Sequence, residues 1–305
     1  MKIFITGGSG YIGDILAKKL STEFLIISGS QKQIYNSKKN KRIRYKKINY
    51  HSLKSLKNNF KGIDVVIHLV GMNKEECEKN KKRSLIFKEK VTLNIINACK
   101  HNGIQKLIYL SSSQIYKDFQ NNSINEKSKL DKGNFYSKGH ILAEKKILKL
   151  YADNFTIIRA SNIFGFLEIK KKGEQKKNLV HMLLEDAIKK NVIKIKNPNI
   201  IKNFMPVSLL VENIKLILKT NKFNKKIINL GSKSLSLYNL ALSIQKKLKT
   251  NKKNKYKIRI EISKKIVKSN SKHAYRSLVK KITFSPKLFN IEMDNIINLL
   301  TKKTY

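Results

Sequence analysis

The residues with the clearest chemical meaning form a glycine-rich turn between a short apolar segment and a helical one. The turn reads Thr6-Gly7-Gly8-Ser9-Gly10-Tyr11-Ile12-Gly13 and takes four of the chain's 13 glycines. One glycine reaches backbone angles closed to other residues, a second lets the main chain approach a pyrophosphate, and a third lets helix and strand pack closely. The helix that follows offers N–H groups and a partial positive charge to phosphates. The turn therefore predicts a dinucleotide site, and a plain tight turn is the alternative.

The end of the second apolar segment bears on which dinucleotide is bound. An acidic residue there would hydrogen-bond the adenosine ribose hydroxyls and indicate NAD. The segment instead ends Ile27-Ser28-Gly29-Ser30, followed by Gln31 and Lys32. A 2′-phosphate is not repelled at such a site, and the Lys32 ammonium attracts it. We expect NAD or NADP as cofactor, with NADP slightly favoured.

Apolar and helical segments alternate through the N-terminal half. Six short runs, most of them continuously apolar, are typical of parallel strands covered on both faces. They are Lys2–Thr6, Phe24–Ser28, Ile43–Ile48, Asp64–Leu69, Lys106–Ser111 and Thr156–Arg159. The segments with apolar residues at helical spacing are Tyr11–Leu20, Leu53–Phe60, Arg83–His101 and Ser137–Asp153. This order predicts an α/β fold, a Rossmann doubly wound parallel sheet.

The pattern changes after Gly165. A Lys-rich segment, Lys170–Lys177, precedes three helical stretches and short strands, and Lys249–Lys257 reads as a charged linker. The helical stretches are Asn178–Asn191, Val207–Lys219 and Ser236–Leu248. We predict an NAD(P)-binding Rossmann domain over residues 1–166 and a smaller C-terminal substrate-binding α/β lobe over 167–305.

The charge of the chain is strongly positive. Its 66 Lys and Arg against 20 Asp and Glu give a formal net charge of +46, which alone suggests nucleic acid or an anionic membrane as partner. The basic residues are scattered, however, and no nucleic-acid module accompanies them. Abundant Lys, Asn and Ile with little Arg is the composition expected of an A/T-rich genome. Nucleic-acid binding is therefore a minor alternative, and we expect the charge to steer acidic substrates.

Cysteine content and hydropathy bear on the compartment. Only Cys77 and Cys99 are present, too few for a disulfide framework, and nothing in the sequence requires a metal. No apolar run approaches the ~20 residues that span a bilayer, and Met1 opens directly into strand-like sequence. We expect a soluble, unprocessed cytoplasmic protein without membrane insertion.

Later motifs make the chain similar to the NAD-dependent epimerase/dehydratase family, the extended short-chain dehydrogenases/reductases. The spacing of Gly7, Gly10 and Gly13 resembles that family's turn, and Tyr136 followed by Glu144 matches its tyrosine and helix glutamate. The other matching segments are His68-Leu69-Val70-Gly71, Ser111-Ser112-Ser113-Gln114-Ile115-Tyr116, Arg159-Ala160-Ser161-Asn162-Ile163-Phe164-Gly165 and Asn229-Leu230-Gly231-Ser232.

This resemblance implies that Ser112, Tyr136 and the residue four positions after Tyr136 are catalytic. Tyr136 takes the proton of a hydroxyl as a hydride leaves the carbon, and Ser112 positions the substrate oxygen. The family's third residue is a lysine that binds the nicotinamide ribose and lowers the tyrosine pKa. Here that position is His140, and Lys138 lies on a different helix face. An imidazole of ordinary pKa near ~6.5 is largely neutral at pH 7, so we expect a slower or pH-shifted catalyst.

The same resemblance implies a set of binding residues. Cofactor contacts fall on Gly7, Gly10, Tyr11, Ile12, Gly13, Asn49, Leu69, Val70, Gly71, Tyr136 and His140. Substrate contacts fall on Ser113, Gln114, Asn162, Asn178 and Lys202. For Asn162 and Asn178 a local turn or helix cap is an equal alternative.

Other departures from the family pattern narrow the reaction. The family's dehydratases carry Thr-Asp-Glu where this chain has Ser112-Ser113-Gln114, so elimination of water is disfavoured and epimerisation or keto reduction remains. Lys202 replaces the arginine that binds a substrate diphosphate, which keeps the charge and loses the bidentate fork. Lys88 replaces the usual asparagine ahead of Val91-Thr92, so a polar contact that supports the backbone is lost.

These observations together predict an enzyme. We expect an NAD(P)-dependent epimerase or keto-reductase that moves a hydride on a nucleotide sugar or a similar small acidic substrate, in the synthesis of surface polysaccharide precursors. A non-catalytic NAD(P)-binding scaffold or sensor of the same fold is the alternative. The resemblance also implies a homodimer formed through Arg83–His101 and Ser137–Asp153.

Overall fold

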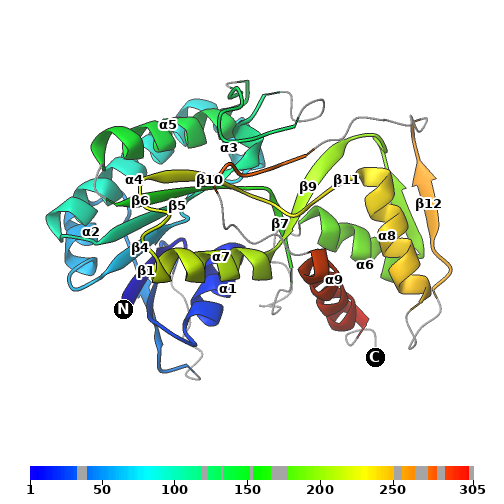
Figure 1. The fold of residues 1–305 in the computed structure, drawn as a ribbon, viewed down its shortest axis with the longest axis horizontal. Helices are drawn as coiled ribbons and strands as arrows, with labels where there is room; N and C mark the ends of the chain where they lie inside the picture. The colour runs from blue at the N-terminus through cyan, green and yellow to red at the C-terminus, as the bar shows by residue number, and fades with distance from the viewer. Residues whose placement is uncertain are drawn as a thin grey trace. The chain divides into compact units, whose positions relative to one another are not determined.

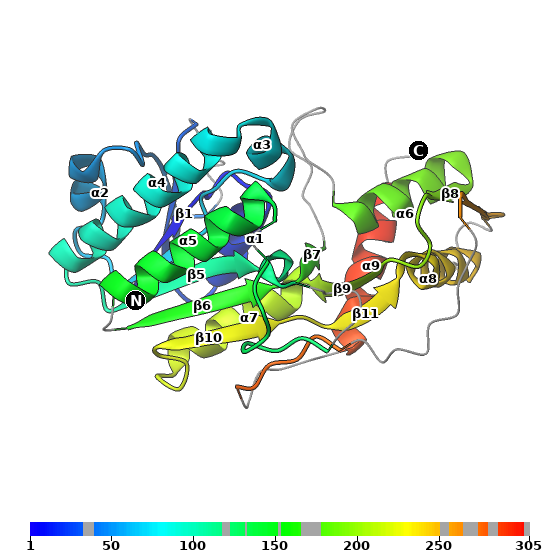
Figure 2. The ribbon, with the colours of Figure 1, turned by 90° about the horizontal axis from the view of Figure 1, so that it is seen from above.

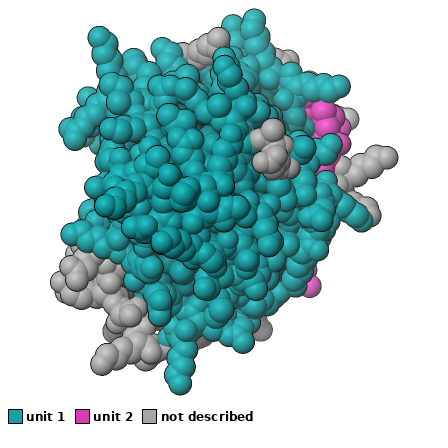
Figure 3. All heavy atoms as spheres, turned by 90° about the vertical axis from the view of Figure 1, so that its left-hand side faces the viewer, with its two compact units in different colours: residues 1–117, 126–160, 211–229 teal, residues 118–125, 161–210, 230–305 magenta. Residues whose placement is uncertain are grey.

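The computed structural model describes residues 1–32, 40–117, 123–131, 133–151, 154–165, 178–250, 256–264, 274–279 and 286–301. The chain forms two compact units. The first holds residues 1–117, 126–160 and 211–229, and the second holds 118–125, 161–210 and 230–305. Figure 3 shows a face of the first unit in teal. This division differs from a single boundary at residue 166, because the chain returns to the first unit after residue 210.

A seven-stranded sheet forms the centre of the first unit. Its order is β10-β6-β5-β4-β1-β2-β3, and every neighbouring pair from β6 to β3 is parallel. The strands are β1 (Lys2–Thr6), β2 (Leu25–Ser30), β3 (Ile43–Lys47), β4 (Val65–His68), β5 (Lys106–Ser112), β6 (Phe155–Ala160) and β10 (Lys226–Leu230). The order reverses direction between β1 and β4, the switch point at which ligands bind in such sheets. The predicted Rossmann fold is confirmed.

Helices cover both faces of this sheet. Figures 1 and 2 show α2, α4 and α5 over one face and α1 and α7 over the other. Their bounds are α1 (Tyr11–Leu20), α2 (Leu53–Asn59), α3 (Lys74–Lys79), α4 (Lys81–His101), α5 (Phe135–Leu150) and α7 (Val207–Lys219). On the second face Lys215 of α7 forms an ion pair of 2.6 Å with Glu23, which follows α1. None of the described helices is long and apolar enough to span a membrane.

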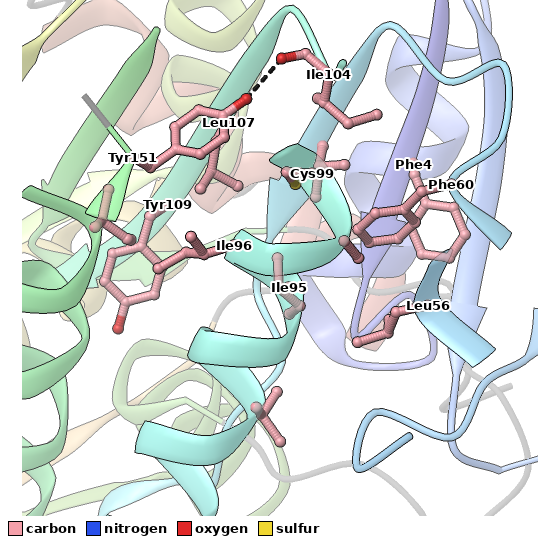
Figure 4. Packing of buried hydrophobic residues seen from close by; sticks show 14 of the residues in the cluster. Phe4, Leu56, Phe60, Ile95, Ile96, Cys99, Ile104, Leu107, Tyr109 and Tyr151 are labelled. Atoms are coloured by element: carbon pink, nitrogen blue, oxygen red, sulfur yellow. Dashed lines mark hydrogen bonds between the residues drawn. The ribbon is translucent and has the colours of Figure 1, made fainter. Parts of the chain in front are cut away.

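A hydrophobic core lies between the sheet and the helices α2, α4 and α5. Every residue of β4 and β6 is buried, as the continuous apolar runs predict for strands covered on both faces. Figure 4 shows the Phe4 and Phe60 rings close together and tilted, with Ile95, Ile96 and Cys99 projecting from α4 into the same core. The core includes one polar anchor, since the Tyr151 hydroxyl donates to the carbonyl of Ile104 at 2.6 Å.

The second unit has a separate core. A three-stranded sheet joins β11 (Lys233–Ser236), β9 (Ile201–Pro206) and β7 (Asn162–Phe164), and β12 (Arg259–Ile262) pairs with β8 (Val192–Ile195). Around them lie α6 (Leu179–Lys190), α8 (Leu237–Lys249) and α9 (Pro286–Thr301). The sequence pattern did not predict α9. The Lys170–Lys177 segment lies outside the described residues, as does most of the charged linker.

A buried ionic network ties α5 to β6 within the first unit. The Arg159 guanidinium donates to both carboxylate oxygens of Glu144, with the shortest contact at 2.7 Å, and to the Tyr116 hydroxyl at 2.8 Å. The Tyr116 hydroxyl donates in turn to Asn229 at 2.6 Å. The network thus links the β5–α5 loop, α5, β6 and β10. It anchors α5 at Glu144, two helical turns after Tyr136.

We expect Arg159→Met to lower the free energy of unfolding by about 3–5 kcal/mol, because it leaves the Glu144 carboxylate buried without its partner. Urea denaturation measures this change. The double variant Glu144→Met with Arg159→Met serves as control, since it removes both charges and should recover much of the loss. A single variant as stable as the wild-type chain would contradict this role.

Candidate active site

The glycine turn has the geometry that a dinucleotide pyrophosphate requires. Gly7 has a φ of +69°, in the left-handed region, and a Cβ at Gly13 would lie 2.3 Å from the Gly7 carbonyl oxygen. The Gly10 N–H donates to that same oxygen at 2.9 Å, which closes the turn. Gly10 has no side chain to cap α1, so the partial positive charge at the helix N-terminus faces an incoming ligand. These residues fit the phosphates of an NAD-type cofactor.

Tyr50 supports the turn from the loop after β3. The N–H of Gly7 donates to the Tyr50 hydroxyl at 3.0 Å, and the Tyr50 side chain is fully buried. Sequence reasoning named only its neighbour Asn49, which is exposed and caps the local turn by accepting from the His51 N–H at 3.0 Å. Tyr50 was missed because 43 residues separate it from Gly7, and only the paired sheet brings the two together.

A buried histidine lies between the ends of β1 and β4. The Thr6 hydroxyl oxygen accepts the N–H groups of Leu69 and Val70 at 3.0 and 3.2 Å, so its proton is donated to His68 Nδ1 at 3.1 Å. The Nε2 of His68 then carries the proton and faces Thr92 Oγ1 at 3.4 Å. Burial holds the pKa of His68 well below its ordinary value of 6.5, and the nearby Lys88 charge lowers it further. His68 is therefore neutral at pH 7.

The structure brings the predicted Ser112 and Tyr136 together. Ser112 is the last residue of β5, and Tyr136 lies in the first turn of α5, which Asn134 caps by accepting the Ser137 N–H at 2.8 Å. The Ser137 hydroxyl donates to the Gln114 carbonyl at 2.6 Å, so α5 is tied to the end of β5. Burial raises the pKa of Tyr136, while its hydrogen bond with the Ser112 hydroxyl lowers it.

His140 lies one helical turn after Tyr136, and their ring centroids are 4.6 Å apart. The side chain is 7% exposed, and its Nδ1 shares a 2.7 Å hydrogen bond with the Tyr109 hydroxyl of β5. Burial holds the pKa of His140 well below 6.5, and the charges of Lys88 and His68 lower it further. A neutral imidazole therefore occupies the position at which the family pattern has a lysine.

The Lys88 side chain of α4 lies near Tyr136 and His140, in the same pocket. It is 8% exposed, and its ammonium donates to the Val70 carbonyl at 3.4 Å and lies 5.1 Å from the centre of the Tyr109 ring. Burial lowers the pKa of Lys88 from 10.5 to about 8. A small pocket adjoins this group, and its lining consists of Met72, Cys77, Ser84, Lys88, Phe135, Tyr136, Gly139 and His140. Both cysteines of the chain are free and buried.

The predicted substrate residues fall in two groups. Ser113 is buried and Gln114 exposed in a single 3₁₀ turn directly after Ser112. Asn162, Asn178 and Lys202 belong to the second unit, each within its own local structure. Asn162 donates to the Asn203 carbonyl at 2.8 Å, and Asn178 caps α6 by accepting the His181 N–H at 3.0 Å. Lys202 is half-buried on β9.

Such a fold and turn define a dinucleotide-binding Rossmann protein, and comparison with known proteins identifies the family. The model of the NAD dependent epimerase/dehydratase family matches residues 3–231, and the chain belongs to this family. A dTDP-D-glucose 4,6-dehydratase of Dictyostelium discoideum is 29% identical over 260 residues, which make up 76% of this chain and 58% of the relative. The chain thus spans little more than half the length of this relative.

Solved structures share the fold. A UDP-glucose 4-epimerase of Thermotoga maritima, crystallised with UDP-glucose, has a TM-score of 0.78 at 14% identity, with 100% of both chains covered. A UDP-N-acetylglucosamine 4-epimerase of Methanobrevibacter ruminantium has a TM-score of 0.79 at 19% identity and covers 99% of this chain and 98% of its own. A fold with a parallel Rossmann sheet and smaller C-terminal sheets, as in UDP-sugar epimerases, is confirmed.

We expect Gly13→Ala to lower the free energy of unfolding by about 1–3 kcal/mol, because the new Cβ overlaps backbone atoms of Gly7 and Gly8 that have no room to move. Thermal or urea unfolding measures the change. Gly139→Ala is the matched control, since its Cβ meets Lys88 and Leu85 at ordinary contact distances of 3.6 Å or more. Equal stabilities of the two variants would contradict the account of the turn.

We expect Lys88→Met to raise the free energy of unfolding at pH 7 by up to about 3 kcal/mol, as the difference between pKa values of 10.5 and about 8 implies. The folded chain binds Lys88's proton less tightly than the unfolded chain does, so wild-type stability rises with pH across that window. The free energy of unfolding of Lys88→Met should lack this rise with pH. Urea denaturation between pH 7 and 10.5 measures both effects, and two parallel stability curves would contradict the burial of a charged Lys88.

Proposed function

We propose that this chain is an NAD(P)-dependent epimerase or keto-reductase that acts on a nucleotide sugar by hydride transfer. The observation that supports this most strongly is the Ser112–Tyr136 hydroxyl pair, which lies at the carboxyl end of β5. The glycine turn follows β1 of the same parallel sheet, so both features face the same sheet edge. Two hydroxyls beside a dinucleotide site are the groups that a carbinol oxidation needs.

The roles of the residues follow from their chemistry. The glycine turn and the N-terminus of α1 hold the cofactor's phosphates, and the bound nicotinamide ring accepts or returns a hydride. The Ser112 hydroxyl donates to the substrate oxygen and orients it. The Tyr136 phenolate takes the proton of the substrate hydroxyl as the carbon is oxidised, and the phenol returns a proton when the ketone is reduced. The 2.7 Å hydrogen bond between His140 and the Tyr109 hydroxyl fixes the imidazole that packs beside Tyr136.

Epimerisation or keto reduction agrees better with the site than dehydration does. Elimination of water requires an acid and a base at the sugar carbon, and Ser113 and Gln114 stand where the family's dehydratases carry Asp and Glu. The two similar solved structures are named as 4-epimerases, whereas the curated relative is named as a dehydratase. We assign this chain to the epimerases rather than the dehydratases, because the serine-rich end of its strand lacks both carboxylates.

NADP is our proposed choice between the two nicotinamide cofactors. The end of β2 carries Ser30, whose hydroxyl lies 2.6 Å from the Ser9 hydroxyl and accepts the Lys32 N–H at 3.2 Å. The last residues of β2 are Ser28, Gly29 and Ser30, and none of them carries a carboxylate. A 2′-phosphate therefore meets no negative charge from these residues. The exposed ammonium of Lys32 favours it.

We also propose a cytoplasmic homodimer that serves the synthesis of surface polysaccharide precursors. Helices α4 and α5 pack side by side on one face of the sheet (Figure 2), where a second copy would add its own pair. Each carries an exposed apolar residue, Ile86 at 64% and Leu148 at 45% exposure. The high positive charge of the chain attracts the diphosphate of a nucleotide sugar.

The experiment that tests this function has two steps. Calorimetry with NAD, NADH, NADP and NADPH identifies the cofactor, and a panel of UDP- and dTDP-sugars is then followed by nicotinamide absorbance and product chromatography. We expect the NADP forms to bind at least as tightly as the NAD forms. We expect Tyr136→Phe to lower turnover by about 10²–10⁴-fold while cofactor affinity is kept. Cofactor binding without turnover of any sugar would favour the non-catalytic scaffold instead.

A further inference from the structure

Two residues that depart from the family pattern meet in one place in this structure. By its resemblance to the family, the chain would carry asparagine at position 88 and lysine at position 140, and it carries Lys88 and His140 instead. We propose that Lys88 supplies, from α4, the positive charge beside Tyr136 that relatives supply from position 140 of α5. The proposal rests on the proposed function of Tyr136. Under this proposal the two substitutions together move one positive charge from position 140 to position 88, and neither is a simple loss of function.

The path of the Lys88 side chain supports this relocation. Its aliphatic part runs along α5 at Gly139, where an added Cβ would lie 3.6 Å from the Lys88 Cγ. Its ammonium reaches the Val70 carbonyl and Gly71, which follow β4, where the family pattern places the cofactor. Lys88, Tyr136 and His140 line the same pocket. The ammonium and the tyrosine therefore lie in one small pocket next to the proposed cofactor site.

The surroundings of Lys88 make a purely structural role a poor explanation. The ammonium has one long hydrogen bond and the face of the Tyr109 ring, and none of the described carboxylates forms an ion pair with it. A buried cation with so few partners destabilises the fold. An asparagine or methionine would fill the space at lower cost. A cation kept at such a position is explained by an anion that arrives or forms there, and the Tyr136 phenolate is such an anion.

Each element packed against Lys88 contributes uncharged groups at neutral pH. The titratable groups near it are His68 at the end of β4, Tyr109 of β5, Cys77 of α3, and Tyr136 and His140 of α5. Both histidines are held neutral by burial and by the Lys88 charge itself, as their lowered pKa values indicate. A lysine at position 140 would place a second cation against the first. A neutral residue at 140 is therefore the partner that a lysine at 88 requires.

This arrangement makes the charge sensitive to pH. Burial lowers the pKa of Lys88 to about 8, so the cation is present below that pH and is lost as the pH rises through it. The cation stabilises the phenolate that Tyr136 forms during turnover, and its loss removes that stabilisation. We expect an alkaline decline of turnover near pH 8 that a lysine in the relatives' position would shift upward.

A swap of the two residues tests the proposal. The proteins to compare are wild type, Lys88→Asn, His140→Lys and the double variant, with Lys90→Met as control for an exposed charge on the same helix. The ionisation of Lys88 is read by nuclear magnetic resonance of the lysine side chains in the wild type and in His140→Lys, with Lys88 assigned from Lys88→Asn. Turnover against pH is measured on whichever nucleotide sugar the wild type converts.

We expect Lys88→Asn to lower kcat/KM roughly tenfold at pH 7, and we expect His140→Lys alone to lower the pKa of Lys88 further, because it adds a second buried cation. The double variant should recover kcat/KM and move the alkaline decline to higher pH, and the Lys90→Met control should match the wild type. A double variant no better than Lys88→Asn would overturn the proposal, as would a Lys88 titration that His140→Lys leaves unchanged. The titration needs no substrate, so it decides the role of Lys88 even if no sugar is converted and the proposed function fails.

Discussion

The packing of α5 against α4 and the end of β5 is the constraint on which the site depends. Helix α5 has to carry Tyr136 to the Ser112 hydroxyl and also stay buried along its length. Its start is fixed by the Asn134 cap and by the Ser137 bond to Gln114, and its far half by the Glu144–Arg159 ion pair. Between these anchors Gly139 has no side chain, and that gap is where Lys88 crosses from α4. The geometry of the helix pair therefore decides which charges can reach the tyrosine.

The electrostatics of this region follow from burial. His68 and His140 are both neutral because leaving water penalises their charged forms, and each has a hydroxyl partner that a neutral imidazole satisfies. The Lys88 ammonium is the cation that remains among the residues lining the pocket. A charge held there at a cost to stability is typical of functional sites, where perturbed pKa values concentrate.

Much of the fold was predictable from local sequence. Continuous apolar runs identified β1 and β4 because a parallel strand covered on both faces has no polar side, and helical spacing gave α1 and α7 to the residue. The return of the chain to the first unit after residue 210 was not predicted, because a local pattern carries no information on which sheet or core a segment joins. Helix α9 was not predicted either. The family assignment, which the match over residues 3–231 confirms, was predictable because the motifs lie at strand ends, where the sheet fixes their spacing.

The site was predictable in part for the same reason. Ser112 and Tyr136 meet as expected, whereas Tyr50 and Lys88 were not recognised as parts of the site. Both reach it from segments distant in sequence, 43 residues from Gly7 in one case and 18 from Val70 in the other. From the sequence, Lys88 was interpreted only as the loss of an asparagine, because a single substitution does not show which groups the new side chain approaches. The paired change at position 140 was the signal that connects the two.

Nuclear magnetic resonance of the lysine side chains, with Lys88 assigned from the Lys88→Met variant, tests the central claim most directly. The ammonium of Lys88 should titrate near pH 8, apart from the exposed lysines, and its pKa should fall when His140 is replaced by lysine. A Lys88 that titrates with the exposed lysines and does not respond to His140→Lys would contradict the account.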